Sequence, residues 1–352
     1  MQSPPTELEI SISKAINFLE QNQLDDGEFP TVLPKEMLKL TYQNFGINDE
    51  LTENLVFDSS PFVTSLILYS LSFLRHEDKV KDLINKGLSF LLSQMEKGGL
   101  WRYWSSKNKL HMTIPPDLDD ICCISYVVKM NNIAFPNNTK IILENRNDRG
   151  LFYTWLLNNS PRRLISSILT WGKSFAHVDK IWNLTNKDDI CCAVNANVAL
   201  YLGEIPQTQK LITYLTGIVI NDTEDKDISF YNHKLGFYYM LSRAYFNGVT
   251  SLRFVKVSLV NKVLNLQKSD GSFGDELLTG LAISTLLNFN YQSPRLDTAV
   301  DYLLKTQQVD GSWQFIPFYG GYYKAIFGSA ALSTAFAIEA LTRYFLSQKI
   351  QI

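Results

Sequence analysis

The sequence carries little charge, and no segment concentrates charge of one sign. Charged residues make up 19% of its 352 residues, the net charge is −2, and lysine and arginine form no basic run. A nucleic-acid-binding surface requires clustered basic residues, so we expect no nucleic acid among the partners. The length is sufficient for one large domain or two ordinary ones with a sizeable core.

Long apolar runs and secretory features are also missing. The apolar stretch at residues 62–73 is interrupted by threonine and serine and is too short to span a bilayer. Residues 1–7 have neither the basic nor the apolar part of a secretory signal. We therefore expect a cytoplasmic protein. The sequence leaves peripheral contact with a membrane open and does not indicate the oligomeric state.

Cysteine is scarce and oddly placed. The four cysteines form two adjacent pairs, at residues 122–123 and 191–192. Such pairs provide no disulfide framework, which is consistent with a reducing compartment. Structural zinc sites prefer the spacing C-x-x-C, which is absent, so the sequence favours small buried side chains between crowded helices.

A glutamine–glycine–aromatic signature is present four times. The copies lie at residues 23–29, 94–101, 267–273 and 307–313, and the last two are the clearest. Each follows an apolar helical segment, and the Asp-Gly step supplies a turn that ends that helix. The aromatic residue two positions later is expected to fold back over the helix end.

Hydrophobic periodicity predicts two alternating sets of helices. The amphipathic set comprises residues 8–22, 79–94, 161–172, 206–218, 251–266 and 294–307. The second set is more apolar, as expected of buried helices, and comprises residues 61–74, 119–131, 189–202, 235–247, 276–289 and 328–346. This alternation predicts an all-α double ring, an (α/α)6 barrel, in one domain over residues 1–352. The sequence shows no convincing strand pattern and no linker.

Three carboxyl groups lie within four positions, Asp117, Asp119 and Asp120, where a proline pair gives way to an inner helix. Like charges this close cannot all ionise cheaply, so at least one carboxyl should keep its proton. A held proton beside an apolar cavity is a general acid for a weak base such as a carbon–carbon double bond. Helix capping by Asp117 is an alternative reading, and the two are compatible.

The segment at residues 119–123 recurs at residues 188–192, where the next inner helix is predicted to start. Parallel inner helices would bring both acidic pairs to one rim. Helical spacing places these side chains below the two pairs: Cys122, Cys123, Tyr126, Cys191, Cys192 and Asn195. Asn195 and Asn197 are poor choices inside an apolar helix and need hydrogen-bond partners, in the lumen or on a neighbouring helix.

Aromatic residues gather before the predicted inner helices, several of them in glycine-containing loops. They are Trp101, Trp104, Phe152, Tyr153, Trp155, Phe237, Tyr238, Tyr239, Phe318, Tyr319, Tyr322, Tyr323 and Phe327. Aromatic faces stabilise cations, so this clustering favours a lined cavity over plain core filling. The side chains expected to bind substrate are Trp101, Trp104, Cys122, Tyr126, Asn195, Tyr238, Tyr239, Tyr322, Tyr323 and Phe327.

These features resemble the class II terpene cyclases, to which squalene–hopene cyclase belongs. Residues 117–120 match the family's Asp-x-Asp-Asp motif, and the glutamine–glycine–aromatic repeats match its QW motifs. The resemblance implies that Asp119 protonates the terminal alkene of a polyprenyl substrate while Asp117 and Asp120 hold and tune the acid. It implies an isomerase without a cofactor or metal, in which the repeats brace the outer helices.

The single-barrel length is similar to that of the meroterpenoid cyclases of the merosterolic acid type, which implies a prenylated hydroxybenzoate as substrate. The group that usually hydrogen-bonds the acid is not identified, although His177 and His233 are candidates. Two other interpretations stay open. One is a zinc-dependent protein prenyltransferase β-subunit with Asp189, Cys191 and His233 as ligands. The other is a barrel that only binds a lipid or a partner protein.

Overall fold

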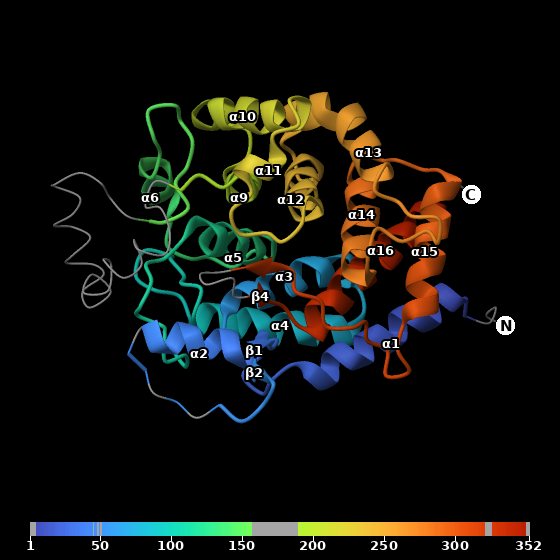
Figure 1. Cartoon of the computed structure of the whole chain (residues 1–352), viewed down its shortest axis with the longest axis horizontal. Coiled ribbons are helices and arrows are strands. Elements are labelled where there is room, and N and C mark those ends of the chain that lie inside the picture. The colour runs from blue at the N-terminus through green and yellow to red at the C-terminus, as the bar shows by residue number, and fades with distance from the viewer. Residues whose placement is uncertain are drawn as a thin grey trace.

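The computed structural model describes residues 5–44, 46–47, 49, 51–156, 189–320 and 326–349. Its helices form two concentric rings (Figure 1). The inner ring consists of α3 (Pro61–Leu71), α5 (Leu118–Met130), α9 (Cys192–Leu202), α12 (Lys234–Phe246), α14 (Glu276–Asn288) and α16 (Ala330–Lys349). Each inner helix packs against the next, and α16 packs against α3, so the ring is closed. The predicted all-α toroid is confirmed.

The outer ring covers the backs of these helices. It includes α1 (Glu7–Asn22), α4 (Asp78–Ser93), α10 (Gln209–Ile220), α13 (Lys256–Leu264) and α15 (Pro294–Thr306). The inner helices are the more buried set because each is enclosed on both sides; every residue of α3 is buried. Small residues allow close packing, since a Cβ atom at Gly280 of α14 would lie 3.0 Å from the backbone of Phe336 on α16.

Some helix boundaries differ from the prediction. The inner helix expected from residue 189 begins at Cys192, after an extended Cys191. Short 3-10 helices, η1 (Ser72–Leu74), η3 (Pro206–Thr208) and η4 (Thr250–Val255), replace parts of three predicted helices. Three helices were not predicted: α2 (Lys35–Asn44), α6 (Thr139–Glu144) and α11 (Glu224–Asp227). The helix predicted at residues 161–172 lies outside the described residues.

The structure contains short strands, although the sequence shows no convincing strand pattern. The antiparallel strands β1 (Val32–Pro34) and β2 (Leu55–Phe57) form one pair, and β3 (Tyr319–Gly320) and β4 (Ile326–Phe327) form another. The Val32 backbone N–H donates to the carbonyl of Gly328 at 2.9 Å, so the two pairs join segments from opposite ends of the chain. Strands of two or three residues are too short to produce an alternating pattern, which explains why the sequence did not reveal them.

The glutamine repeats connect successive outer helices. The side-chain amide of Gln307 donates to the carbonyls of Gly311, in its own turn, and of Ser11 on α1, each at 2.9 Å. Two more copies have the same arrangement: Gln267 with Gly271 and Arg295, and Gln23 with Gly27 and Leu83. Gly311 has φ +92°, and a Cβ atom there would lie 2.4 Å from the carbonyl oxygen of Lys14. Only glycine fits this contact.

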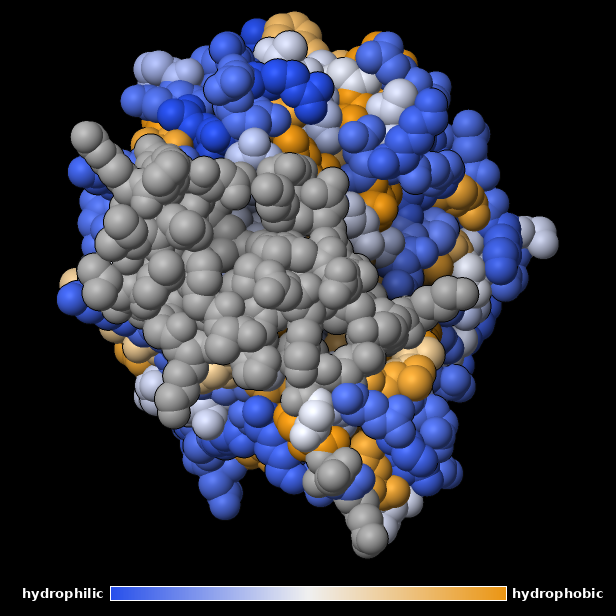
Figure 2. All heavy atoms as spheres, turned by 60° about the vertical axis from the view of Figure 1, so that its left-hand side comes forward, coloured by the Kyte–Doolittle hydropathy of each residue, from blue (hydrophilic) through white to orange (hydrophobic). Residues whose placement is uncertain are grey.

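On the face shown in Figure 2, apolar side chains are scattered among hydrophilic ones. Within the described part of the chain, none of the helices combines the length and apolarity needed to cross a bilayer.

Candidate active site

The acidic segment lies at the N-terminus of α5. Asp117 is the N-cap residue in an extended conformation, and its Oδ1 accepts a hydrogen bond from the Asp120 backbone N–H at 2.9 Å. Asp119 and Asp120 occupy the first helical turn, where the helix dipole favours negative charge. The capping function expected for Asp117 is therefore present, and it fixes the three carboxyl groups relative to one another.

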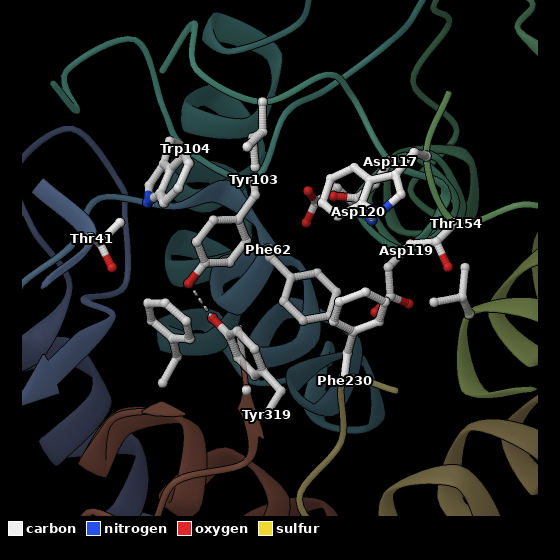
Figure 3. Close-up of a pocket in the computed structure, with 15 residues that line it drawn as sticks. Thr41, Phe62, Tyr103, Trp104, Asp117, Asp119, Asp120, Thr154, Phe230 and Tyr319 are labelled. Atoms are coloured by element: carbon white, nitrogen blue, oxygen red, sulfur yellow. Dashed lines mark hydrogen bonds between the residues drawn. The ribbon is translucent and has the colours of Figure 1, made fainter. Parts of the chain in front are cut away.

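The three carboxyl groups lie at one end of a pocket at the rim of the inner ring (Figure 3). The pocket encloses about 680 Å³ when its open side is included. Its lining consists of Thr41, Phe62, Tyr103, Trp104, Ile114, Asp117, Asp119, Asp120, Thr154, Trp155, Val194, Phe230, Tyr319, Gly320 and Phe327. Most of these side chains are aromatic or aliphatic, so the carboxyl groups face an apolar space.

The far side of this pocket has a different polarity. The hydroxyls of Tyr103 and Tyr319 are hydrogen-bonded to each other at 2.9 Å. Phe62 lies between this hydroxyl pair and the carboxyl groups in Figure 3. The pocket is thus acidic at one end, aromatic in the middle and hydroxyl-bearing at the other end.

Asp119 is the carboxyl group best placed to reach a molecule in the pocket. Its side chain is partly exposed, whereas Asp117 and Asp120 are 7% and 1% exposed. The Asn197 amide donates to Oδ1 of Asp119 at 2.5 Å, and the Tyr231 hydroxyl donates to Oδ2 at 2.7 Å. Burial and the nearby charge of Asp117 raise the pKa of Asp119 to about 7, although these two hydrogen bonds lower it. The carboxyl group is therefore able to hold or release a proton near neutral pH.

The buried carboxyl groups of Asp117 and Asp120 lie close enough to affect each other's protonation. Burial raises the pKa of both, and the charge of Asp117 raises that of Asp120 further, well above its usual range. A buried carboxyl pair is stable when it shares one proton, because two charges so close would repel. Asp120 therefore stays protonated at neutral pH.

A second layer of residues lies behind Asp119. Oδ1 of Asn197, on α9, accepts a hydrogen bond from Nη2 of Arg243, on α12, at 2.6 Å. Sequence reasoning singled out Asn197 as a polar residue in need of a partner but missed Tyr231 and Arg243. Tyr231 lies in the loop before α12, and nothing in its local sequence indicates that it reaches α5.

Comparisons with known proteins add a fold assignment. No family model and no curated protein matches the sequence. Among solved structures, the type II terpene cyclase MstE from Scytonema is 15% identical, with a TM-score of 0.69 over 97% of this chain and 99% of MstE. A protein from Actinoplanes is 12% identical, with a TM-score of 0.68 over 96% of this chain and 99% of its own.

A third structure is ent-copalyl diphosphate synthase from Streptomyces platensis, which is 12% identical with a TM-score of 0.58. The match covers 97% of this chain and 69% of the synthase. The chain has the class II terpene cyclase fold. Two MstE variants were solved in complex with geranylgeranyl dihydroxybenzoate as substrate, and a third was solved with merosterolic acid A as product.

Five of the residues expected at the site line the pocket: Asp117, Asp119, Asp120, Trp104 and Phe327. Tyr322 and Tyr323 lie outside the described residues, as does His177. The other expected lining residues do not line this pocket. They are Trp101, Cys122, Tyr126, Asn195, Tyr238 and Tyr239.

Three of these side chains serve the packing of the rings. The Trp101 indole N–H donates to the carbonyl of Leu91 at 2.7 Å, which fixes the ring against the end of α4. Tyr238 donates to Glu224 at 2.8 Å, and Tyr239 donates to Glu339 at 2.7 Å. Sequence position before or within an inner helix was not sufficient to predict which face these rings occupy.

Of the remaining three, Cys122 and Tyr126 lie beyond the first turn of α5, whereas Asn195 lies in the first turn of α9 but bonds to Phe152 instead of lining the pocket. The Cys122 side chain is fully buried in the core, and the Tyr126 ring lies 6.1 Å from that of Tyr69. The Asn195 side-chain oxygen accepts a hydrogen bond from the Phe152 backbone N–H at 3.0 Å, and its NH₂ group donates to the Phe152 carbonyl at 2.9 Å. The pocket lies at the helix N-termini, so helix residues reach it mainly from first turns, as Asp119 does.

The zinc interpretation finds no support in the described residues. No three His, Cys, Asp or Glu side chains among them are arranged to hold a metal ion. Asp189 instead accepts hydrogen bonds from Thr154 and Ser229, each at 2.8 Å. The Nδ1 atom of His233 accepts from the Leu235 backbone at 3.1 Å and caps α12, so this ring also does not contact the acid.

Proposed function

We propose that this protein is a class II terpene cyclase, an isomerase that protonates the terminal alkene of a polyprenyl substrate through Asp119. The observation that carries the proposal is the position of Asp119. It is the partly exposed member of a buried carboxyl cluster, at the acidic end of an aromatic pocket. An acid with a pKa near the working pH combines proton availability with the ability to release the proton, and the pKa of Asp119 is about 7.

In the proposed reaction the O–H bond of Asp119 breaks and a C–H bond forms at the terminal alkene, which leaves a tertiary carbocation. Asn197 and Tyr231 donate to the two oxygens of the new carboxylate and stabilise it. The faces of Phe62, Trp155 and the other aromatic rings stabilise the cation, by about 1–2 kcal/mol each when water is excluded. The cation then passes along the folded chain. Loss of a proton from carbon, or capture by an internal hydroxyl followed by loss of the hydroxyl proton, yields an isomer of the substrate.

Asp117 and Asp120 serve this acid indirectly in the proposal. Their shared proton keeps the net charge of the cluster low, while Asp117 caps α5 and raises the pKa of Asp119. Proton transfer and rearrangement require no redox cofactor. We assign the activity to one barrel domain over residues 1–352.

We propose a prenylated hydroxybenzoate as the substrate. The support is the likeness to MstE over nearly the whole of both chains, together with the geranylgeranyl dihydroxybenzoate bound by MstE variants. The terminal alkene would meet Asp119, and the phenolic end would extend toward the hydroxyls of Tyr103 and Tyr319.

The test is the Asp119→Asn variant, incubated with farnesyl and geranylgeranyl hydroxybenzoates and with the corresponding diphosphates. We expect the rate of cyclisation, measured by mass spectrometry and NMR, to fall by about 10²–10⁴-fold, because the amide keeps the shape and lacks the acidic proton. Circular dichroism should show an unchanged fold. A fully active Asp119→Asn enzyme would refute the proposed function.

The control is Asp275→Asn. Asp275 is the N-cap of α14 and accepts from the Leu278 backbone N–H at 2.8 Å, so it caps an inner helix as Asp117 does, but it does not line the pocket. If the acidic residues at helix starts act only as caps, the Asp119 and Asp275 variants should behave alike. We expect activity to be lost only in the first.

A further inference from the structure

Arg243 is a buried cation directly behind the acid. Its side chain is 1% exposed, on α12, and the described residues provide no carboxylate in an ion pair with it. By contrast, the buried Arg343 pairs with Glu339 at 3.1 Å. The Arg243 guanidinium instead lies over the rings of Tyr69 and Tyr239, at 4.9 and 5.6 Å from their centroids. Buried charges are rarely kept without a carboxylate partner, so this arrangement requires an explanation.

The hydrogen bonds of Arg243 determine how the Asn197 amide is oriented. A guanidinium has only donors, so the atom of Asn197 that faces Nη2 of Arg243, 2.6 Å away, must be the carbonyl oxygen Oδ1. The NH₂ group of the same amide then points the other way and donates to Oδ1 of Asp119 at 2.5 Å. Without Arg243 the amide would be free to turn and to present its oxygen to Asp119.

The two orientations have opposite effects on the acid. An NH₂ group donating to Asp119 stabilises the carboxylate that remains after proton transfer, whereas an amide oxygen would accept the proton of Asp119 and stabilise the neutral acid. The positive charge of Arg243 acts in the same direction as the donated hydrogen bond. Both contributions make Asp119 a stronger acid than its burial alone would allow.

We infer that Arg243 is a positioning residue for Asp119: it orients the Asn197 amide and supplies a buried positive charge that together stabilise the Asp119 carboxylate. The effect on the acid follows from the contacts alone. Its consequence for catalysis rests on the proposed cyclase function. Arg243 does not line the pocket, and its hydrogen bond reaches the acid only through Asn197. We therefore expect no contact between Arg243 and the substrate.

Several other titratable groups lie near Arg243, on its own helix and on neighbouring inner helices. They are Asp119, Cys123 and Tyr126 on α5, Tyr69 on α3 and Tyr239 on α12 itself. Beyond the two tyrosines lie the charged groups of α16, with Glu339 acting on both rings and Arg343 on Tyr69. Burial raises the pKa values of Cys123, Tyr69 and Tyr239, so these groups stay neutral at neutral pH. Asp119 is thus the group next to Arg243 that titrates near pH 7.

The first experiment measures the pKa of Asp119 without a substrate. Protein labelled with ¹³C at aspartate carboxyls is titrated by NMR, and the Asp119 signal is assigned by its loss in Asp119→Asn. We expect Arg243→Met to raise the pKa of Asp119 by about one unit, at the low end of the effect of an opposite charge nearby. Asn197→Leu should raise it as well. Arg243→Lys, which keeps the charge but not the planar fork, should raise it by less.

Asn288→Leu is the matched control. Asn288 is also buried on an inner helix and donates to a neighbouring helix, at Ser242 Oγ, 2.9 Å away, but it contacts neither Arg243 nor Asp119. We expect it to lower stability without moving the pKa of Asp119. An unchanged pKa in both Arg243→Lys and Asn197→Leu overturns the inference even if Arg243→Met does not fold. Equal shifts in the control overturn it too.

The second experiment uses the cyclisation assay. In Arg243→Met we expect the alkaline limb of the kcat profile to move to higher pH while kcat at pH 6 falls about tenfold and KM stays the same. A merely structural role would lower the rate without moving the limb. Asn197→Leu combined with Arg243→Met should be slower than Asn197→Leu alone only by the effect of the lost charge, so the two losses should be less than additive. If no substrate is cyclised but the pKa shifts as expected, the inference stands and the proposed function fails.

Discussion

Replacing Gln307 with methionine should weaken the closure of the outer ring. The Gln307 amide donates to Ser11 on α1 and to Gly311 in its own turn, each at 2.9 Å. Methionine keeps the length of the side chain and removes both donors. A hydrogen bond contributes about 0.5–1.5 kcal/mol net, so we expect the free energy of unfolding to fall by about 2 kcal/mol. At about 2.1 cal/mol/K per residue over 352 residues, this lowers Tm by about 3 °C.

Gln308→Met is the matched control, one residue away. The Gln308 side chain accepts from Ser312 Oγ at 2.8 Å, within the same turn, and does not reach α1. Calorimetry should show a much smaller drop in Tm for this variant. Hydrogen exchange should show faster exchange of α1 amides in Gln307→Met only. Equal drops in both variants, or unchanged exchange in α1, would refute the reasoning that this glutamine joins the first and last outer helices.

Two further predictions concern the acid and its surroundings. Tyr231→Phe removes the hydroxyl that donates to Asp119 Oδ2 at 2.7 Å. The loss of about 1.5 kcal/mol should slow cyclisation about tenfold, as measured by initial rates. Tyr201→Phe is the control and should leave the rate unchanged, because the Tyr201 hydroxyl bonds to Asn138 outside the pocket. Burial raises the pKa of both Asp119 and Asp58 to about 7, so the folded state keeps protons that the unfolded chain loses above about pH 4. The free energy of unfolding should therefore fall as pH rises from about 4 to 7, and Asp58→Asn should flatten this dependence in urea titrations; a profile that rises with pH over this range contradicts the assignment.

Much of the ring architecture was predictable because it is encoded locally. The periodicity of each helix and the glycine turns of the repeats depend on neighbouring residues, and both inner and outer helices appear close to the expected bounds. Residues 117–120 were equally informative, since a cap and a first turn are local features. The start of α9 was misjudged because the acidic residue at 189 was taken as part of the helix, whereas it bridges two loops instead.

The pocket walls and the layer behind the acid were harder to foresee because they depend on contacts across the ring. Tyr231 and Asp119 are hydrogen-bonded although they lie 112 positions apart in the sequence, and Arg243 and Asn197 lie 46 positions apart. Adjacent residues such as Tyr238 and Tyr239 point to different partners, on α11 and α16. Helical periodicity assigns a residue to a buried face, but it does not distinguish the packed core from the open rim of the ring. This distinction decides which aromatic residues line the pocket.

The pairing of Val32 with Gly328 also has a consequence for how the protein is made. The pocket wall runs from Thr41 to Phe327, and α3 finds its last inner neighbour only in α16. A chain still emerging from the ribosome therefore has apolar inner helices but no means of closing them, and such long-range closure is slow. Until α16 has left the ribosome, these surfaces are available to chaperones and proteases, and the pocket forms only after the segment around Phe327 has been released.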